Sequence, residues 1–172
     1  MHIIIDGYNL IRQSDSLKRF EGISLESGRN ELIRRIALYK KSRGHRITIV
    51  FDGWASGPLM EERDREGGID IIYSRRGEKA DEVIKRMVKK GEEEIVVVTS
   101  DRSIADSISR NGGVAISSPE FEAKMEGRSL YDYPTSDSED QHSRMFMGTQ
   151  KKGPSRKISK KQRAVLKRTR KL

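Results

Sequence analysis

The chain has no cysteine in its 172 residues. This absence excludes disulfide bonds, thiolate zinc sites and a catalytic thiol. The sequence also lacks any apolar run that approaches the roughly 18 residues of a membrane-spanning helix. Its first residues show neither the basic region nor the long apolar stretch of a secretory signal. We therefore expect a soluble, cytoplasmic protein.

Several common site patterns are missing as well. The three histidines, His2, His45 and His142, do not have the spacing of metal ligands. There is no GxxxxGK(S/T) loop for nucleotide phosphates, and no GxGxxG follows an apolar run. Tyr8 stands two residues after Asp6, where a DxD phosphatase loop would carry its second acid. These absences argue against P-loop enzymes, dinucleotide-binding folds and DxD phosphatases, and no Ser-His-Asp set replaces them.

Positive charge is gathered at the end of the sequence. The net charge is +9, and residues 151–172 hold 11 Lys and Arg without a single acid. Subtraction from the 35 basic and 26 acidic residues leaves 24 and 26 in residues 1–150, a net charge of −2. A nearly neutral body with a basic tail is typical of a protein that binds polyanions.

Composition divides the chain into three parts. We expect one ordered domain over residues 1–127, long enough to bury a hydrophobic core. Residues 128–157 are rich in Ser, Asp and Gly, which predicts a disordered, partly acidic linker. Residues 158–172 form the basic tail, where Ser159 and Gln162 match the capping box that starts a helix.

The hydrophobic pattern of the first part predicts an α/β domain. Short runs rich in branched apolar residues alternate with amphipathic segments, which favours a mostly parallel sheet of about five strands. We expect strands at residues 3–5, 46–51, 69–73, 94–99 and 114–117, and helices at 24–43, 79–90 and 103–111 and from Ser118 onward. Residues 11–22 are expected to be a polar connector, and residues 54–68 a loop.

Acidic residues follow three of the predicted strands. Asp6, Asp52 and Asp101 stand at strand ends, and Asp81 opens the helix over 79–90. Ligands of open α/β sheets bind beyond the carboxyl ends of the strands. Carboxylates gathered there raise one another's pKa values, a conflict that Mg²⁺ or Mn²⁺ would remove. Such an ion can activate water against a phosphodiester.

Ordinary structural roles remain open for the same acids. Asp6 can cap a helix or form an Asx-turn, and Asp81 can interact with the helix dipole, as can Glu78 and Glu82. Helical spacing places Asp106 opposite the apolar face of its helix, which predicts an exposed side chain rather than a fourth ligand.

Four short motifs resemble the YacP-like branch of the NYN domains, which belongs to the PIN-like nuclease superfamily. They are Asp6-Gly7-Tyr8-Asn9, Val50-Phe51-Asp52-Gly53, Glu78-Lys79-Ala80-Asp81-Glu82 and Val98-Thr99-Ser100-Asp101, within a resemblance over about residues 1–126. The resemblance implies a three-layer PIN-like fold and a metal-dependent ribonuclease with catalytic acids at Asp6, Asp81 and Asp101. Asn9 would orient the first acid or the phosphate, and Asp52 would be an accessory metal ligand. Lys79 departs from the small or hydroxyl residue expected at its position.

RNA, single-stranded or otherwise accessible, is the partner that the charge and the resemblance favour, with the ribosome as a further candidate. Phosphate contacts are expected from two loop arginines and from cations within the basic residues 151–172. These are Arg75, Arg76, Lys151, Lys152, Arg156, Lys157, Lys160, Lys161, Arg163, Lys167 and Arg168. Trp54 is a candidate for guiding the strand. A non-catalytic RNA-binding or ribosome-associated module with a vestigial acidic site stays open, as does a tail folded against the acidic stretch 132–140.

Overall fold

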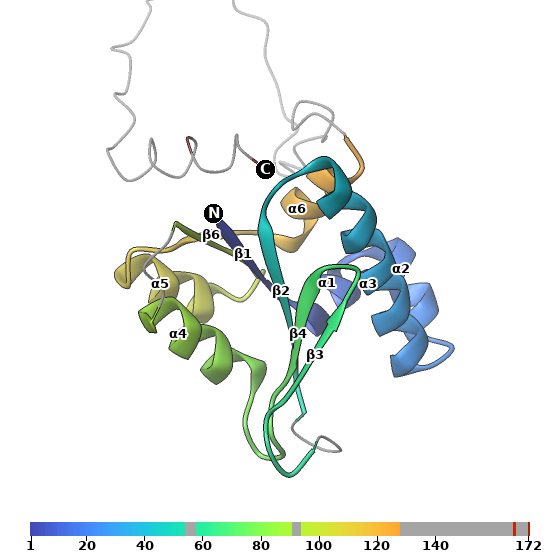
Figure 1. Ribbon diagram of the computed structural model, residues 1–172, viewed down its shortest axis with the longest axis horizontal. Helices are drawn as coiled ribbons and strands as arrows, with labels where there is room; N and C mark the ends of the chain where they lie inside the picture. The colour runs from blue at the N-terminus through green and yellow to red at the C-terminus, as the bar shows by residue number, and fades with distance from the viewer. Residues whose placement is uncertain (54–57, 91–93, 128–166, 168–171) are drawn as a thin grey trace, which may run out of the picture.

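The computed structural model describes residues 1–53, 58–90, 94–127, 167 and 172. Its described part is an α/β domain in which strands and helices alternate (Figure 1). The elements in chain order are β1 (His2–Asp6), α1 (Gly7–Gln13), α2 (Asp15–Glu21), α3 (Leu25–Ser42), β2 (Arg46–Phe51), β3 (Glu62–Glu66), β4 (Ile69–Tyr73), α4 (Ala80–Lys90), β5 (Ile95–Val98), α5 (Arg102–Arg110), β6 (Val114–Ile116) and α6 (Ser118–Met125).

The sheet confirms the predicted mostly parallel topology. Its strand order is β3-β4-β2-β1-β5-β6, and every pairing except that of β3 with β4 is parallel. The central strand β1 lies between β2 and β5 and is buried along its whole length. Because helices cover both faces of such a sheet, the inner strands can be continuous runs of Ile and Val.

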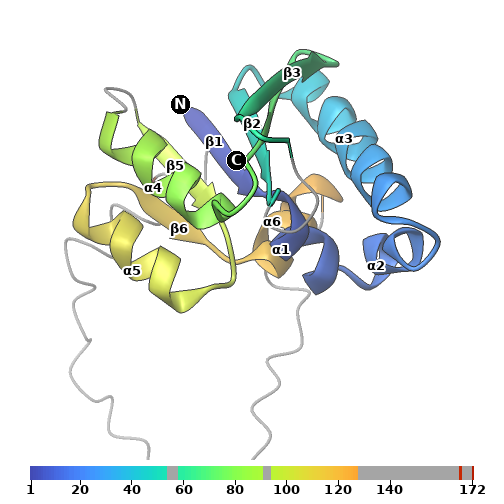
Figure 2. The same ribbon diagram turned by 90° about the horizontal axis from the view of Figure 1, so that it is seen from below.

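Helices cover the two faces of the sheet to give three layers. Figure 2 shows α4 and α5 on one side and α1, α2 and α3 on the other. Successive side chains of β1 enter opposite cores, as the period of two requires. Ile3 and Ile5 join the core beneath α1, α3 and α6, whereas Ile4 joins the core beneath α4 and α5.

The predicted connector over residues 11–22 is wrong, because α1 and α2 occupy most of it. Each helix is only one to two turns long, and each begins at a polar cap. The Asp6 side chain caps α1, and Ser14 Oγ accepts a hydrogen bond from the Leu17 amide at 3.2 Å. Burial of Leu10, Ile11 and Leu17 then holds both helices against the core.

The prediction of a loop over residues 54–68 is wrong for its second half, because β3 lies there and adds a sixth strand to the five that were expected. All five residues of β3 are exposed, and β3 pairs antiparallel with β4. Gly67 and Gly68 form the turn between the two strands with φ angles of 57° and 79°, which glycine adopts without steric cost. The charged sequence of β3 suits an exposed edge, where it hinders pairing with another chain.

The starts of the four predicted helices agree with the structure to within one residue. Ser24 caps α3, and Ser117 caps α6. Ser118 is the first helical residue of α6, and it is fully buried. No helix in the described ranges has both the length and the apolarity to cross a membrane.

Most of the predicted linker and tail lies outside the described residues. Lys167 is helical and exposed. Leu172 packs into the core beneath α3, and Tyr39 Oη donates a hydrogen bond of 2.7 Å to its carbonyl oxygen.

Candidate active site

The four predicted acids lie at one edge of the sheet. Asp6 is the last residue of β1, Asp52 directly follows β2, and Asp101 lies just beyond β5. Because these strands are parallel neighbours, their carboxyl ends meet, in the lower half of Figure 1 for β1 and β2. Asp81 joins them from the first turn of α4. The negative charges of the other three acids all reach the Asp6 carboxyl and raise its pKa.

Asp6 is the most deeply buried of these acids, with 8% of its surface exposed. Its Oδ1 accepts a hydrogen bond of 3.1 Å from the Asn9 amide, so the expected helix-capping role is present. No described lysine, arginine or histidine forms an ion pair with it. Burial is the main reason that its pKa rises to about 6, while the Asn9 bond opposes the rise. The cap therefore satisfies one oxygen but does not balance the charge.

Asp81 shares the site with a lysine that the sequence motifs did not single out. Lys85 lies one turn further along α4, and its Nζ is 3.9 Å from Asp81 Oδ2. Burial raises the pKa of Asp81, Lys85 lowers it, and Asp101 raises it again. Lys85 also lowers the pKa of Asp101. The spacing of four residues from Asp81 on a helix was the pattern that could have identified Lys85.

Asp101 is exposed and held in its ionised form. It caps α5, where its Oδ1 accepts hydrogen bonds from the Ser103 amide at 2.7 Å and the Ile104 amide at 3.3 Å. Hydrogen bonding from Ser103 is the main cause that lowers the pKa of this carboxyl. Since both amide bonds end on Oδ1, they fix the carboxylate without occupying Oδ2.

Asn9 acts through its backbone as well as its side chain. The backbone amide orients Asp6, whereas the side-chain oxygen accepts two other bonds. These come from the Ser100 amide at 2.9 Å and from the Ser118 hydroxyl at 2.8 Å. Ser100 Oγ in turn accepts a bond of 3.2 Å from the Ser118 amide. Asn9 thus joins the end of β1 to the turn that carries Asp101.

Gly7 has a packing role rather than the turn-forming role suggested by its position after Asp6. α1 begins directly at Gly7. A Cβ added there would lie 2.4 Å from Cε1 of Phe51 and 3.1 Å from Cγ2 of Ile49. The missing side chain lets the start of α1 lie directly against the Phe51 and Ile49 side chains of β2.

The predicted phosphate-binding residues are only partly within the described chain. Arg75 and Arg76 are exposed between β4 and α4. Arg75 Nε is 3.4 Å from Glu78 Oε2, and the Arg76 amide donates to the Pro58 carbonyl at 2.8 Å. Of the tail cations, Lys167 is described and exposed, whereas Trp54 and the following lie outside the described residues: Lys151, Lys152, Arg156, Lys157, Lys160, Lys161, Arg163 and Arg168. Asp106 is exposed, as expected.

The acids suit a hard cation, although their present arrangement does not already surround one. Within residues 1–53, 58–90 and 94–127, no three acid or histidine side chains are close enough to bind a single ion together. Asp6, Asp52, Asp81 and Asp101 nevertheless offer only oxygen ligands, which Mg²⁺ and Mn²⁺ prefer. A divalent cation would also supply the counter-charge that no described residue gives to buried Asp6.

Known proteins resemble this chain in sequence and in fold. A model of the YacP-like NYN domain matches residues 3–171, which extends beyond the region of the four motifs. The uncharacterized protein YacP of Bacillus subtilis (strain 168) is 29% identical over 127 residues, or 72% of this chain and 74% of that protein. The crystal structure of Rae1 (YacP) from Bacillus subtilis matches with a TM-score of 0.62 at 28% identity and covers 74% of each chain. The crystal structure of a mutant of that protein matches with a TM-score of 0.61 at 28% identity, over 74% of this chain and 75% of the mutant.

Proposed function

Because the chain belongs to the YacP-like NYN domain family of PIN-like nucleases, we propose that it is a Mg²⁺- or Mn²⁺-dependent endoribonuclease acting on single-stranded or otherwise accessible RNA. The observation that carries the proposal is Asp6, a buried carboxylate among other acids with no described cation paired to it. Burying a charge without a counter-charge is costly, so the arrangement favours a site that binds a cation.

In this proposal Asp6, Asp81 and Asp101 hold the metal and Asp52 is an accessory ligand. A bound Mg²⁺ or Mn²⁺ supplies an activated water and stabilises the leaving oxygen of the phosphodiester. Hydrogen bonds within the protein orient these ligands. The Asn9 amide orients Asp6, and the first amides of α5 orient Asp101, while the Ser103 side chain, followed by the Ile104 amide, lowers the pKa of Asp101.

The basic tail supplies affinity for RNA, or for a ribosome that presents RNA, through contacts to phosphates. Arg75 and Arg76 add positive charge beside the site, where both are exposed. Such contacts hold a strand without reading its sequence, so the tail is proposed to increase binding across many RNAs.

The test is incubation of labelled RNA with the full chain and Mn²⁺, with Mg²⁺, and with EDTA. We expect internal cleavage with either metal, none in EDTA, and none with Asp101→Asn. Asp106→Asn is the matched control, because it neutralises an exposed acid on the helix that Asp101 caps. RNA binding without cleavage under every metal condition would instead support the non-catalytic RNA-binding module.

The role of the basic C-terminal segment is tested by replacing the 11 Lys and Arg of residues 151–172 with Gln. This change keeps Leu172, whose loss on truncation would also disturb the core. If about 4–6 of the side chains contact phosphates, the slope of log affinity against log salt should flatten by about 3–4 units, at roughly 0.7 per contact. A tail that instead covers the acidic site would give the opposite result, with faster cleavage of short RNA at low salt. An unchanged salt slope would remove the tail from RNA binding.

A further inference from the structure

Arg29 lies at the same edge of the sheet as the acids, on the face covered by α3. Its guanidinium carbon is 5.6 Å from the centre of the Tyr73 ring, at the end of β4. Its Nη1 donates a hydrogen bond of 3.4 Å to Tyr8 Oη, and Tyr8 is two residues after Asp6. Phe51 packs against both tyrosine rings, with centroids 5.3 Å from Tyr8 and 5.6 Å from Tyr73. This aromatic support holds the half-buried guanidinium in one place.

Arg29 differs from its neighbours on α3 in having no acidic partner. Arg34 and Arg35 both pair with Glu31 at 2.8 Å. Within residues 1–53, 58–90 and 94–127, no carboxylate forms an ion pair with Arg29, and its charge rests on aromatic rings and a phenol. A guanidinium has five N–H donors in a plane that matches two oxygens of a phosphate. Only one hydrogen bond of Arg29 is used within the described protein, so the group retains donors for an anion.

We propose that Arg29, positioned by Tyr8 and Tyr73, binds a backbone phosphate of the RNA strand beside the phosphate that is cleaved at Asp6. The inference rests on the proposed function. An RNA strand that approaches Asp6, Asp52, Asp81 and Asp101 is repelled by them until a metal binds, so a fixed positive group at the same edge of the sheet would attract the strand. Arg29 meets this need from the α3 side of the site, opposite the α4 side that carries Lys85.

The test measures binding of a fluorescent single-stranded RNA oligonucleotide to the full chain in EDTA, where no cleavage competes. Arg29→Met should weaken binding about fivefold at 0.1 M salt and flatten the salt slope by about 0.7, the effect of losing one phosphate contact. Arg29→Lys keeps the charge and should keep the slope. Lys41→Gln removes an exposed charge from the far end of the same helix and should change neither quantity.

Oligonucleotides with one neutral methylphosphonate locate the contact. One position should weaken binding of the wild type but have no further effect on Arg29→Met, and it should lie within a few nucleotides of the cleaved bond. Thermal unfolding of Arg29→Met and Arg29→Lys confirms that each variant is folded. If inorganic phosphate competes as well as the oligonucleotide does, the site binds free phosphate and the RNA assignment is wrong.

Failure of this inference is distinguishable from failure of the proposed function. A folded Arg29→Met protein with wild-type affinity and salt slope would overturn the Arg29 site even if RNA is cleaved normally. Conversely, an Arg29-dependent slope in a protein that cleaves no RNA would preserve the phosphate site and overturn the nuclease.

Discussion

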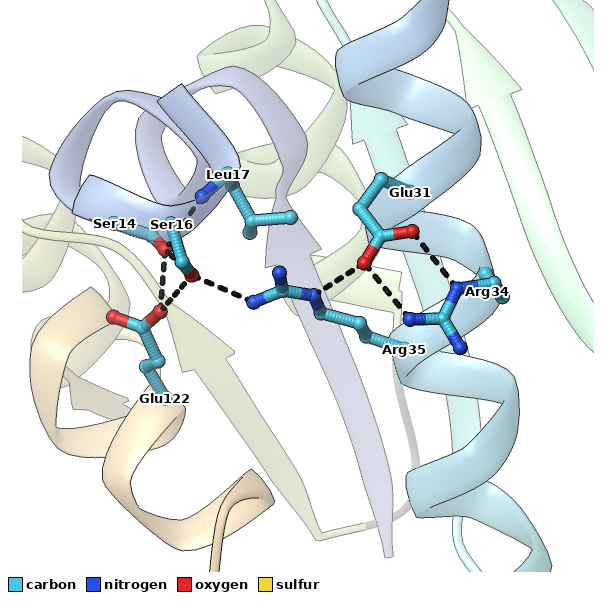
Figure 3. Close-up of polar contacts among 7 residues, drawn as sticks. All are labelled: Ser14, Ser16, Leu17, Glu31, Arg34, Arg35 and Glu122. Atoms are coloured by element: carbon cyan, nitrogen blue, oxygen red, sulfur yellow. Dashed lines mark hydrogen bonds and ion pairs between the residues drawn. The ribbon is translucent and has the colours of Figure 1, made fainter. Parts of the chain in front are cut away.

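Two acidic residues of the domain, Glu31 and Asp6, have opposite surroundings. Glu31 on α3 accepts hydrogen bonds from Arg34 at 2.8 and 2.9 Å and from Arg35 at 2.8 Å (Figure 3). Hydrogen bonding from Arg34 is the main reason that the pKa of Glu31 falls to about 2. Asp6 has no such partner among the described residues, and burial raises its pKa to about 6.

Arg35, one of the two partners of Glu31, also takes part in contacts that connect three helices. Arg35 Nη1 donates to Ser16 Oγ at 2.6 Å, and Ser16 Oγ donates to Glu122 at 3.2 Å (Figure 3). Ser14 donates a second bond to the same Glu122 oxygen. This chain of contacts links α2, α3 and α6. At Glu31 the fold supplies two cations from the same helix, and one of them, Arg35, also joins α3 to α2. At Asp6 no described residue supplies a cation, which is the arrangement expected of a functional site.

The largest expected effect separates the two sites by activity. Asp6→Asn should lower RNA cleavage more than about 100-fold, since even residues behind metal ligands can cost that much. Glu31→Gln should leave cleavage at the wild-type rate, because Glu31 is paired on the outer helix layer. Initial rates on labelled RNA at saturating Mn²⁺ provide the measurement. If Asp6→Asn and Glu31→Gln lost cleavage equally, the losses would reflect a less stable fold, and Asp6 would have no separate role in cleavage.

The second prediction uses the pH dependence of stability. Because the pKa of Asp6 rises from 3.8 in the unfolded chain to about 6, its contribution to the metal-free fold is greatest below pH 3.8 and is lost as the pH rises through 6. The loss amounts to at most about 3 kcal/mol, at 1.36 kcal/mol for each pKa unit. Asp6→Asn should therefore be more stable than the wild type at pH 8 in EDTA, with the difference shrinking toward pH 4.

Urea unfolding of the two proteins across this pH range measures the effect, and their difference cancels groups that titrate alike in both. Added Mn²⁺ should reverse the order at pH 8, because it stabilises only a fold that binds it. A difference that does not change with pH would mean that the Asp6 charge is already balanced in the metal-free protein.

The third prediction concerns Glu31, whose pKa shifts in the opposite direction to that of Asp6. Its pKa falls from 4.5 to about 2, so its stabilising effect is present above pH 4.5 and is lost as the pH falls toward 2. Glu31→Gln should cost about 1 kcal/mol at pH 7, since Arg34 is well exposed and such pairs are weak. Urea unfolding at pH 7 and pH 3 tests this. A stability gain on substitution would contradict the stabilising role assigned to this pair.

The sequence predicted the parts of the fold that hydrophobic periodicity determines. Strands such as β2 and β5 are continuous apolar runs, and α4 presents a regular apolar stripe, so their positions agreed with the pattern. Helices α1 and α2 were missed because each spans only seven residues, too few for a sustained helical period, and the caps at Asp6 and Ser14 define them instead. Strand β3 was missed because all of its residues are charged, and only pairing with β4 makes it a strand.

The candidate site was predictable to the extent that it lies at strand ends. Asp6, Asp52 and Asp101 follow from that rule because parallel strands bring their ends together, and Asp81 was found from its place in the first turn of the predicted helix. Groups that enter from the helix layers were not predictable in this way. Arg29 reaches the site through tertiary packing and has no neighbouring motif that marks it. Lys85 could have been identified only from its spacing of four residues from Asp81 on the same helix.

The smallest expected effect on cleavage comes from a comparison of two buried serines, Ser14 in the contacts around Arg35 and Glu122 and Ser118 in the contacts around Asn9. Ser14 and Ser118 are both fully buried, and each hydroxyl donates to a side-chain oxygen, of Glu122 and Asn9 respectively. Ser118→Ala and Ser14→Ala should each cost about 1–2 kcal/mol, the usual loss for a buried hydrogen bond or a helix cap. Only Ser118→Ala should also slow cleavage, by severalfold, because Ser118 and Asn9 position the turn that carries Asp101.

Raising the Mn²⁺ concentration should restore part of the rate that Ser118→Ala loses, since a displaced ligand weakens metal affinity before it blocks the chemistry. Cleavage rates at several Mn²⁺ concentrations, together with urea unfolding of both variants, decide the matter, and an equal slowing by Ser14→Ala would show that the Asn9 contacts have no special role in the site.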